Sequence, residues 1–88
     1  MQNYLIFSDS YKEYVDTLKK LENLNYNWRN GQKPIYYTKY WNESREGVVI
    51  CLHPETKVIT WEDFSMYTDY YTNYVTVNID ELKYMNLS

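Results

Sequence analysis

Cys51 and His53 are the residues whose types and spacing come closest to catalytic chemistry. They stand two positions apart in an apolar run, so both side chains would face one side of a strand, where a histidine can activate a cysteine thiolate. His53, however, opens a turn sequence at Pro54, and no third residue is placed to orient the imidazole. We therefore interpret Cys51 as a core residue, and we predict no catalytic residue and no enzyme activity.

Metal and phosphate chemistry have even less support in the sequence. A metal site needs three or four ligands, and one cysteine with one histidine cannot supply a soft set. The acidic pairs at 62–63 and 80–81 are adjacent in sequence, so their side chains diverge on a strand. Gly31 and Gly47 are the sole glycines, which excludes a glycine-rich phosphate loop. The prediction is no metal and no cofactor.

Aromatic residues are the strongest candidates for function. The chain has 12 tyrosines in 88 residues, and alanine is absent while asparagine, lysine and isoleucine are abundant, as in proteins from AT-rich genomes. Coding bias explains that excess but not where the rings lie. One group of rings stands in a polar stretch among basic residues, and a second has helical spacing at Tyr67, Tyr70 and Tyr71.

A small core uses large aromatic rings, so each ring has a plain structural interpretation. One helix face and one sheet face are already filled by other apolar residues, and we expect the surplus rings to be partly exposed as interface anchors. The predicted binding residues are these rings and the basic residues near them: Trp28, Arg29, Tyr36, Tyr37, Lys39, Tyr40, Trp41, Arg45, Tyr67, Tyr70 and Tyr71. Replacing Tyr37, Tyr40 and Trp41 together should abolish binding without unfolding the domain.

Hydrophobic periodicity predicts the helix and strands on which these residues lie. Residues 3–7 read as a strand, and Ser10 with Glu13 forms a capping box before a helix whose apolar face runs from Tyr11 to Leu21. Asn23 or Asn25 can close that helix. The apolar face consists of Tyr11, Tyr14, Val15, Leu18 and Leu21.

Further strands are expected at 26–28, 48–52, 57–61 and 74–79, with 48–52 central because it is apolar on both faces. A turn is expected at Asn30 and Gly31, and residues 35–46 read as a long surface loop with an edge strand at 35–38. Val75, Val77 and Ile79 would share the buried face of the last strand.

The sum is an α+β fold of one domain, residues 1–88, in the order β-α-β-β-β-β. One amphipathic helix would pack on a small, mainly antiparallel sheet of four to five strands. The other sheet face would be left for solvent, a second copy or a partner, with Tyr74, Thr76 and Trp61 near it.

Length, charge and cysteine content exclude several classes of protein. The net charge of −3 argues against a dedicated nucleic-acid binder, and no apolar run is long enough for a membrane span. The first residues lack a basic region and Asp9 interrupts the apolar stretch, so we expect no signal peptide. With one cysteine and no internal disulfide, a protein of the reducing cytoplasm is expected.

A helix ending in Leu18-x-x-Leu21 is followed by Tyr26-x-Trp28-x-x-Gly31 and later by a strand at 59–61. This pattern resembles small uncharacterised proteins encoded by bacteriophages and mobile elements of low-GC bacteria, and it covers residues 11–61. The resemblance implies a context rather than site residues. Compact proteins of that kind often bind and block a host factor, including CRISPR effectors and other immune proteins.

The predicted function is therefore a small, non-enzymatic, phage-type protein of the anti-CRISPR or anti-immune kind. It would inhibit a bacterial defence component by binding through its aromatic surface. One alternative is sequestration of a nucleotide immune signal, a cyclic nucleotide or ADP-ribose derivative, in an aromatic and basic pocket. A second alternative is a homodimeric regulatory or structural phage protein.

Overall fold

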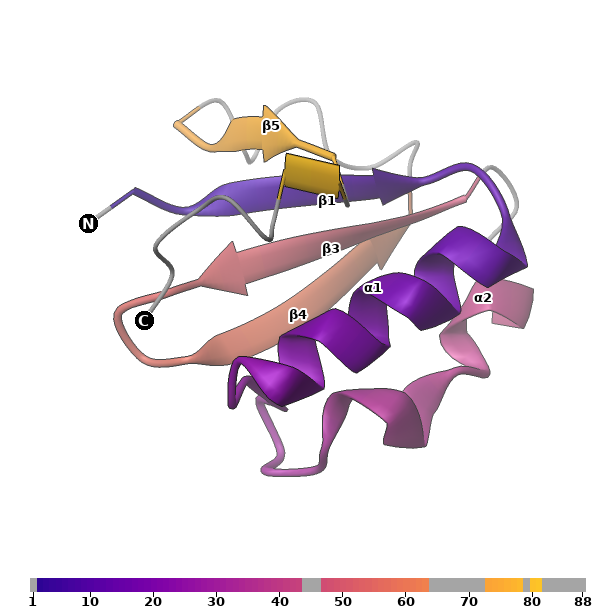
Figure 1. The fold of residues 1–88 in the computed structure, drawn as a ribbon, viewed down its shortest axis with the longest axis horizontal. Helices are drawn as coiled ribbons and strands as arrows, with labels where there is room; N and C mark the ends of the chain where they lie inside the picture. The colour runs from indigo at the N-terminus through magenta and orange to yellow at the C-terminus, as the bar shows by residue number, and fades with distance from the viewer. Residues whose placement is uncertain (1, 44–46, 64–72, 79, 82–88) are drawn as a thin grey trace.

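A helix laid across a five-stranded sheet forms the framework (Figure 1). The computed structural model describes residues 2–43, 47–63, 73–78 and 80–81. The elements in chain order, with η1 a 3₁₀ helix, are β1 (Tyr4–Ser8), α1 (Tyr11–Asn23), β2 (Asn27–Trp28), η1 (Pro34–Tyr37), α2 (Tyr40–Glu43), β3 (Val48–His53), β4 (Val58–Asp63) and β5 (Val75–Val77). The α+β architecture predicted from the sequence is confirmed.

The strand order is β2-β4-β3-β1-β5, which makes the apolar strand β3 the central one, as predicted. β1–β3 and β3–β4 are antiparallel, whereas the outer pairs β1–β5 and β2–β4 are parallel. The sheet is therefore mixed: its long central pairs are antiparallel, in agreement with the prediction of a mainly antiparallel sheet, and its short outer pairs are parallel. β2 runs in the direction of β1 because α1 carries the chain back along the sheet between them, as in any parallel crossover.

Helix α1 begins and ends as its sequence predicts. The Ser10 hydroxyl accepts a hydrogen bond from the Glu13 N–H at 3.2 Å, and the Glu13 carboxylate accepts one from the Asp9 N–H at 2.8 Å. Asn25 follows the helix with φ +67°, a left-handed conformation that asparagine tolerates better than most residues. No helix in the described ranges combines the length and apolar character needed to cross a bilayer.

The buried face of α1 is rotated from the predicted one. Tyr14, Leu18 and Leu21 are fully buried, as expected. Tyr11, which was also expected in the core, is 49% exposed, and Thr17 is buried in its place. Thr17 can be buried because its hydroxyl donates a hydrogen bond to the Glu13 carbonyl one turn earlier, at 2.8 Å.

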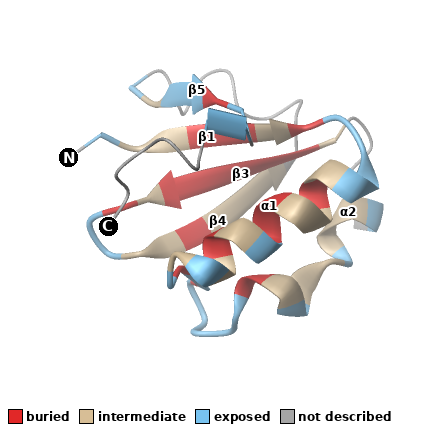
Figure 2. Ribbon diagram, in the orientation of Figure 1, coloured by how far each residue is buried: buried red, intermediate tan, exposed pale blue. Residues whose placement is uncertain are grey.

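Both faces of the sheet are apolar at their centres, as the band of buried residues in Figure 2 shows on β1 and β3. The larger core lies between α1 and the sheet. On the opposite face, Leu5, Val49 and Cys51 are 2% exposed or less, and Phe7 and Tyr74 pack against them. The expectation that this face is left open for solvent or a partner is therefore wrong at its centre.

Two further expectations about the strands change. Val75 lies on edge strand β5 and is 47% exposed, so it does not join Val77 in the core; Ile79 is outside the described residues. Trp61 pairs across the sheet with Ile50 and packs against the core on the α1 side, not on the opposite face. Side chains alternate along a strand, so Trp61 shares the face of Ile59.

The segment after β2 is not the predicted surface loop with an edge strand at 35–38. It forms η1 and α2, and η1 packs against α1. Pro34 occupies the first turn of η1, where its missing N–H costs no hydrogen bond, and Lys33 before it is extended with ψ 149°. Pro34 therefore starts a helical turn here instead of limiting an edge strand.

Candidate functional site

Five aromatic side chains from four separate elements meet on the α1 side of the molecule. Trp28 comes from β2, Tyr36 and Tyr37 from η1, Tyr40 from α2 and Trp61 from β4. We call these five residues the aromatic cluster. The sequence separates its first and last members by more than thirty residues, and the parallel pairing of β2 with β4 brings them together.

The rings of the cluster contact one another in a continuous series. Tyr40 stacks on Tyr37 with centroids 5.0 Å apart and on Trp61 with centroids 4.9 Å apart. The indole of Trp28 meets Tyr37 and Tyr40 edge to face, at 5.9 and 5.2 Å. Tyr36 meets Tyr37 edge to face at 4.8 Å. These are the offset-stacked and T-shaped arrangements that aromatic quadrupoles favour.

Hydrogen bonds hold the cluster to the rest of the fold. The Trp28 Nε1–H donates to the Pro34 carbonyl at 2.8 Å, which connects β2 to the start of η1. The Asn30 side-chain amide donates to the Tyr37 hydroxyl at 2.7 Å. The buried Tyr14 hydroxyl donates to the Tyr37 carbonyl at 2.8 Å. The cluster is therefore ordered before any partner arrives, which reduces the entropy lost on binding.

Exposure divides the described binding rings into three groups: exposed, buried and half-buried. Tyr36 is 64% exposed, whereas Trp28 is 5% exposed and serves as a core residue. Tyr37, Tyr40 and Trp41 are half-buried and pack against the main core, with Trp41 6.0 Å from the ring of Tyr14. Replacing these last three rings together would remove contacts with the core, so we expect the triple substitution to lower the stability of the domain as well as to weaken binding.

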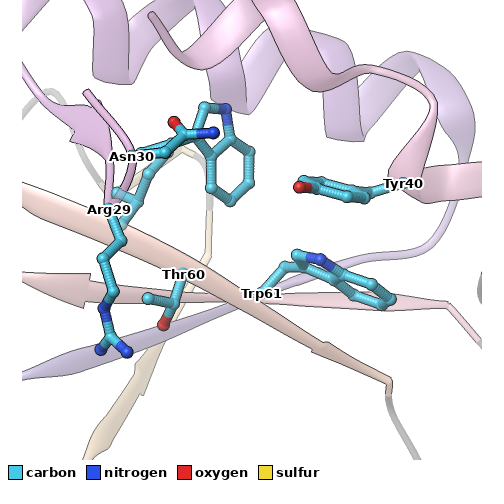
Figure 3. A pocket seen from close by; sticks show the side chains of 7 residues that line it. Arg29, Asn30, Tyr40, Thr60 and Trp61 are labelled. Carbon is cyan, nitrogen blue, oxygen red and sulfur yellow. The ribbon is translucent and has the colours of Figure 1, made fainter. Parts of the chain in front are cut away.

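An open pocket of about 370 Å³ lies beside the cluster. Its lining comes from the end of β2 and the following turn (Trp28, Arg29, Asn30), from β4 (Ile59, Thr60, Trp61) and from α2 (Tyr40). Figure 3 shows the rings of Tyr40 and Trp61 stacked on one side of the gap, with Asn30 and Arg29 on the other. The volume falls within the range of small-ligand sites.

The basic residues predicted for the site lie at its margins. Arg29 is exposed and is the charged residue of the pocket lining. The Lys39 ammonium is 5.8 Å from the centroid of Tyr37, within cation–π range. The remaining predicted residues, Arg45, Tyr67, Tyr70 and Tyr71, lie outside the described residues.

Four pocket residues were not among the predicted site residues: Asn30, Ile59, Thr60 and Trp61. Side chains alternate along a strand, so Trp61 lies on the same face as Ile59, the α1 side. This alternation is visible in the sequence and could have predicted Trp61 as a site residue. Asn30 was recognised only as a turn residue, and it does accept a hydrogen bond from the Gln32 N–H at 3.0 Å. Its second bond, to Tyr37, depends on the tertiary fold.

A second open pocket, of about 330 Å³, lies near the β3–β4 turn. Arg29 lines this pocket as well as the first, and His53, Glu55, Thr56, Val58 and Asn3 complete it. Burial lowers the pKa of His53 below its usual value, and the nearby Arg29 guanidinium lowers it further. The His53 ring also meets Tyr74 edge to face at 5.8 Å.

Cys51 is fully buried in the smaller core, beyond the reach of a substrate. Within the ranges that the structure describes, no three histidine, cysteine, aspartate or glutamate side chains gather to hold a metal ion. Family models, curated proteins and solved structures were all compared with this chain, and none matches it.

Proposed function

We propose that this chain is a small, non-enzymatic binding protein that inhibits a component of bacterial defence by docking through its aromatic cluster. The observation that carries the proposal is the cluster itself: rings from four elements, stacked and hydrogen-bonded to the core, with Tyr36 64% exposed at the margin. Tyrosine and tryptophan anchors of this kind dominate the energetics of protein interfaces. The defence context rests on the sequence resemblance to phage-encoded proteins.

The charges around the cluster support a protein partner. Lys39 and Arg29 lie at its margins, while the chain as a whole carries a net charge of −3. A half-buried apolar centre with charged residues around it is the usual anatomy of a docking surface.

A phage-infection assay tests the proposal. The protein is expressed in bacteria that each carry one defence system, CRISPR systems included, and plaque formation by a sensitive phage is counted. Restored plaques on at least one strain are expected, with restoration lost in Tyr36→Ala because its ring is exposed and can be removed without opening the core. Tyr11→Ala is the matched control, since Tyr11 is 49% exposed on α1 outside the cluster.

Two results would count against this function. One is failure to restore plaques on every defended strain although the protein is folded and expressed. The other is equal activity of Tyr36→Ala and the unmodified protein, which would remove the aromatic cluster from the mechanism.

A second candidate is sequestration of a nucleotide immune signal, and the pocket favours it. Arg29 could meet a phosphate, and the pocket lies against aromatic rings that a base could contact. Because Tyr40 already stacks on Tyr37 and Trp61, a base could not enter between these rings without breaking a stack. A bound base would instead lie in the gap beside them.

Thermal unfolding with cyclic nucleotides and ADP-ribose derivatives tests this candidate. A ligand at 100 times its Kd adds about 2.7 kcal/mol to the free energy of unfolding, which raises Tm by on the order of 10 °C in a domain of this size. Arg29→Gln should abolish the shift. If no nucleotide changes Tm, the candidate fails and docking to a protein stands alone.

A further inference from the structure

The outer edge of β4 has a partner strand over only part of its length. β2 pairs with Val58 and Ile59, whereas β4 continues to Asp63. The Asn27 N–H donates to the Lys57 carbonyl at 3.0 Å, which shows that the peptide groups of Lys57 point toward β2. Peptide groups alternate along a strand, so those of Trp61 point to the same edge. Among the described residues, no strand lies there to receive them.

A tight turn takes the chain away from this edge. The Gly31 N–H donates to the Trp28 carbonyl and the Trp28 N–H donates to the Gln32 carbonyl, both at 2.8 Å. Gly31 has φ +89°, a conformation that side-chain-bearing residues rarely adopt. These bonds form on the side of β2 that faces away from β4. Within the described ranges, the turn therefore leaves β4 without a neighbouring strand on this side beyond Ile59.

The pocket of the aromatic cluster opens at this uncovered edge. Thr60 and Trp61 belong both to the part of β4 that extends beyond its pairing with β2 and to the pocket lining. Arg29, the charged residue of the lining, stands directly after the last residue of β2. In Figure 3 the hydroxyl end of Tyr40 points toward the gap between the two sides of the pocket.

We propose that the open edge of β4 receives an extended peptide segment of the partner, added in line with β2. This proposal rests on the proposed docking function and specifies how the partner binds. The N–H and C=O of Trp61, which point to this edge, would bond to the peptide backbone, as in other cases of strand addition. An aromatic or aliphatic side chain would enter the gap between the stacked rings of Tyr40 and Trp61 on one side and Arg29 on the other. A nearby acidic side chain would pair with Arg29, the group that gives the pocket its charge.

A peptide titration tests the inference on the full chain. The probes are short acetylated peptides with threonine at alternate positions. Each peptide carries one Phe, Trp or Leu, and an Asp two positions after it. Saturable binding is expected in tryptophan fluorescence, with hydrogen exchange of the Trp61 backbone amide slowed about tenfold or more. Two matched peptides carry N-methyl groups on alternate amides. One of the two should lose about tenfold in affinity, since its donors would face β4.

Charge recognition has its own control. Arg29→Gln should weaken the Asp peptide several-fold and leave the matched Asn peptide unchanged. Three outcomes would overturn the inference: no saturable binding at about 1 mM peptide, equal binding of the parent and both N-methylated peptides, or unchanged exchange at the Trp61 amide. A dimer of the protein alone that protects the Trp61 amide would assign the edge to a second copy and would also overturn it.

The inference and the proposed function can fail separately. Tyr36 does not line the pocket, so Tyr36→Ala should bind the peptides normally while losing activity in infected cells. Peptide binding without any inhibition of defence would leave the edge site standing and remove the defence role. Inhibition of defence without peptide binding would remove the edge site alone.

Discussion

The buried hydroxyl of Tyr14 donates a hydrogen bond to the carbonyl oxygen of Tyr37 at 2.8 Å. This bond joins the helix that forms the core to the 3₁₀ turn that presents the exposed aromatic surface. The ring of Tyr14 is fully buried, so its position depends on the packing of α1 against the sheet. The placement of the aromatic cluster therefore depends on the core.

Tyr14→Phe should lower the free energy of unfolding by about 1 kcal/mol, because it removes this hydrogen bond while keeping the ring. Urea denaturation measures the change. Tyr11→Phe, on the same helix with its ring 49% exposed, should stay within about 0.5 kcal/mol of the unmodified protein. Equal effects of the two substitutions would show that the Tyr14 bond contributes nothing to stability.

Asn25 adopts φ +67° after the C-terminus of α1. Asn25→Gly should be neutral or stabilising by a few tenths of a kcal/mol, because glycine has no Cβ to strain in this region. Asn25→Val should destabilise by about 1–2 kcal/mol, because a branched side chain is strained there. Thermal unfolding of the two variants separates these cases. Matching Tm values for both would contradict the left-handed conformation.

Alkaline pH should destabilise the protein through Tyr26. Burial, with a smaller contribution from nearby Tyr4, raises the pKa of Tyr26 to about 12 from 10.0. Between these values the unfolded chain loses the proton while the folded chain keeps it. The free energy of unfolding should therefore fall as pH rises above 10, by at most about 1.4 kcal/mol per pH unit. Below pH 10 this group has no effect on the pH dependence.

Tyr26→Phe provides the matched measurement, since the other tyrosines remain and their contributions cancel in the comparison. The variant should show a shallower loss of stability between pH 10 and 12 than the unmodified protein in urea titrations. Identical slopes would mean that the Tyr26 pKa is the same in the folded and unfolded states.

His53 is the single histidine of the chain, so NMR reports its titration without overlap. Its pKa should lie below 6.5, first because of burial and second because of the Arg29 charge. The unfolded chain then binds a proton before the folded one as pH falls. The contribution of His53 to stability should be fully present above pH 6.5 and should decrease as pH falls toward the folded pKa.

Arg29→Gln should raise the His53 pKa without restoring it fully, because burial remains. Lys33→Gln is a suitable control, since Lys33 is an exposed cation that does not line the His53 pocket. A His53 pKa that does not respond to Arg29→Gln would show that the guanidinium lies too far away to act.

The sequence predicted those parts of the fold that depend on interactions between neighbouring residues or on a regular hydrophobic period. The cap at Ser10, the left-handed Asn25 and the central strand β3 all follow from neighbours in sequence. The edges were less predictable. Val75 alternates as a buried residue would, but its strand lies at the sheet edge, where burial depends on what packs beside it.

The candidate site could be predicted only in part for a similar reason. A surplus of rings was evident in the sequence, and Tyr36 is exposed as that surplus implies. In the sequence, Pro34 predicts an edge strand, although proline suits the first turn of a helix equally well. In the structure the Trp28 Nε1–H donates to the Pro34 carbonyl, a side-chain contact that the proline pattern does not reveal.

Three features can be predicted from the sequence alone. They are one helix with a clear apolar face, one strand that is apolar on both sides, and more aromatic rings than a small core needs. Only the tertiary structure decided that Trp61 joins Tyr40, that Arg29 stands between two pockets, and that β4 extends beyond β2. The physical reason is the range of the interactions. Caps and periodicity act between neighbours in sequence, whereas ring stacking and strand pairing depend on distant segments brought together by the hydrophobic core.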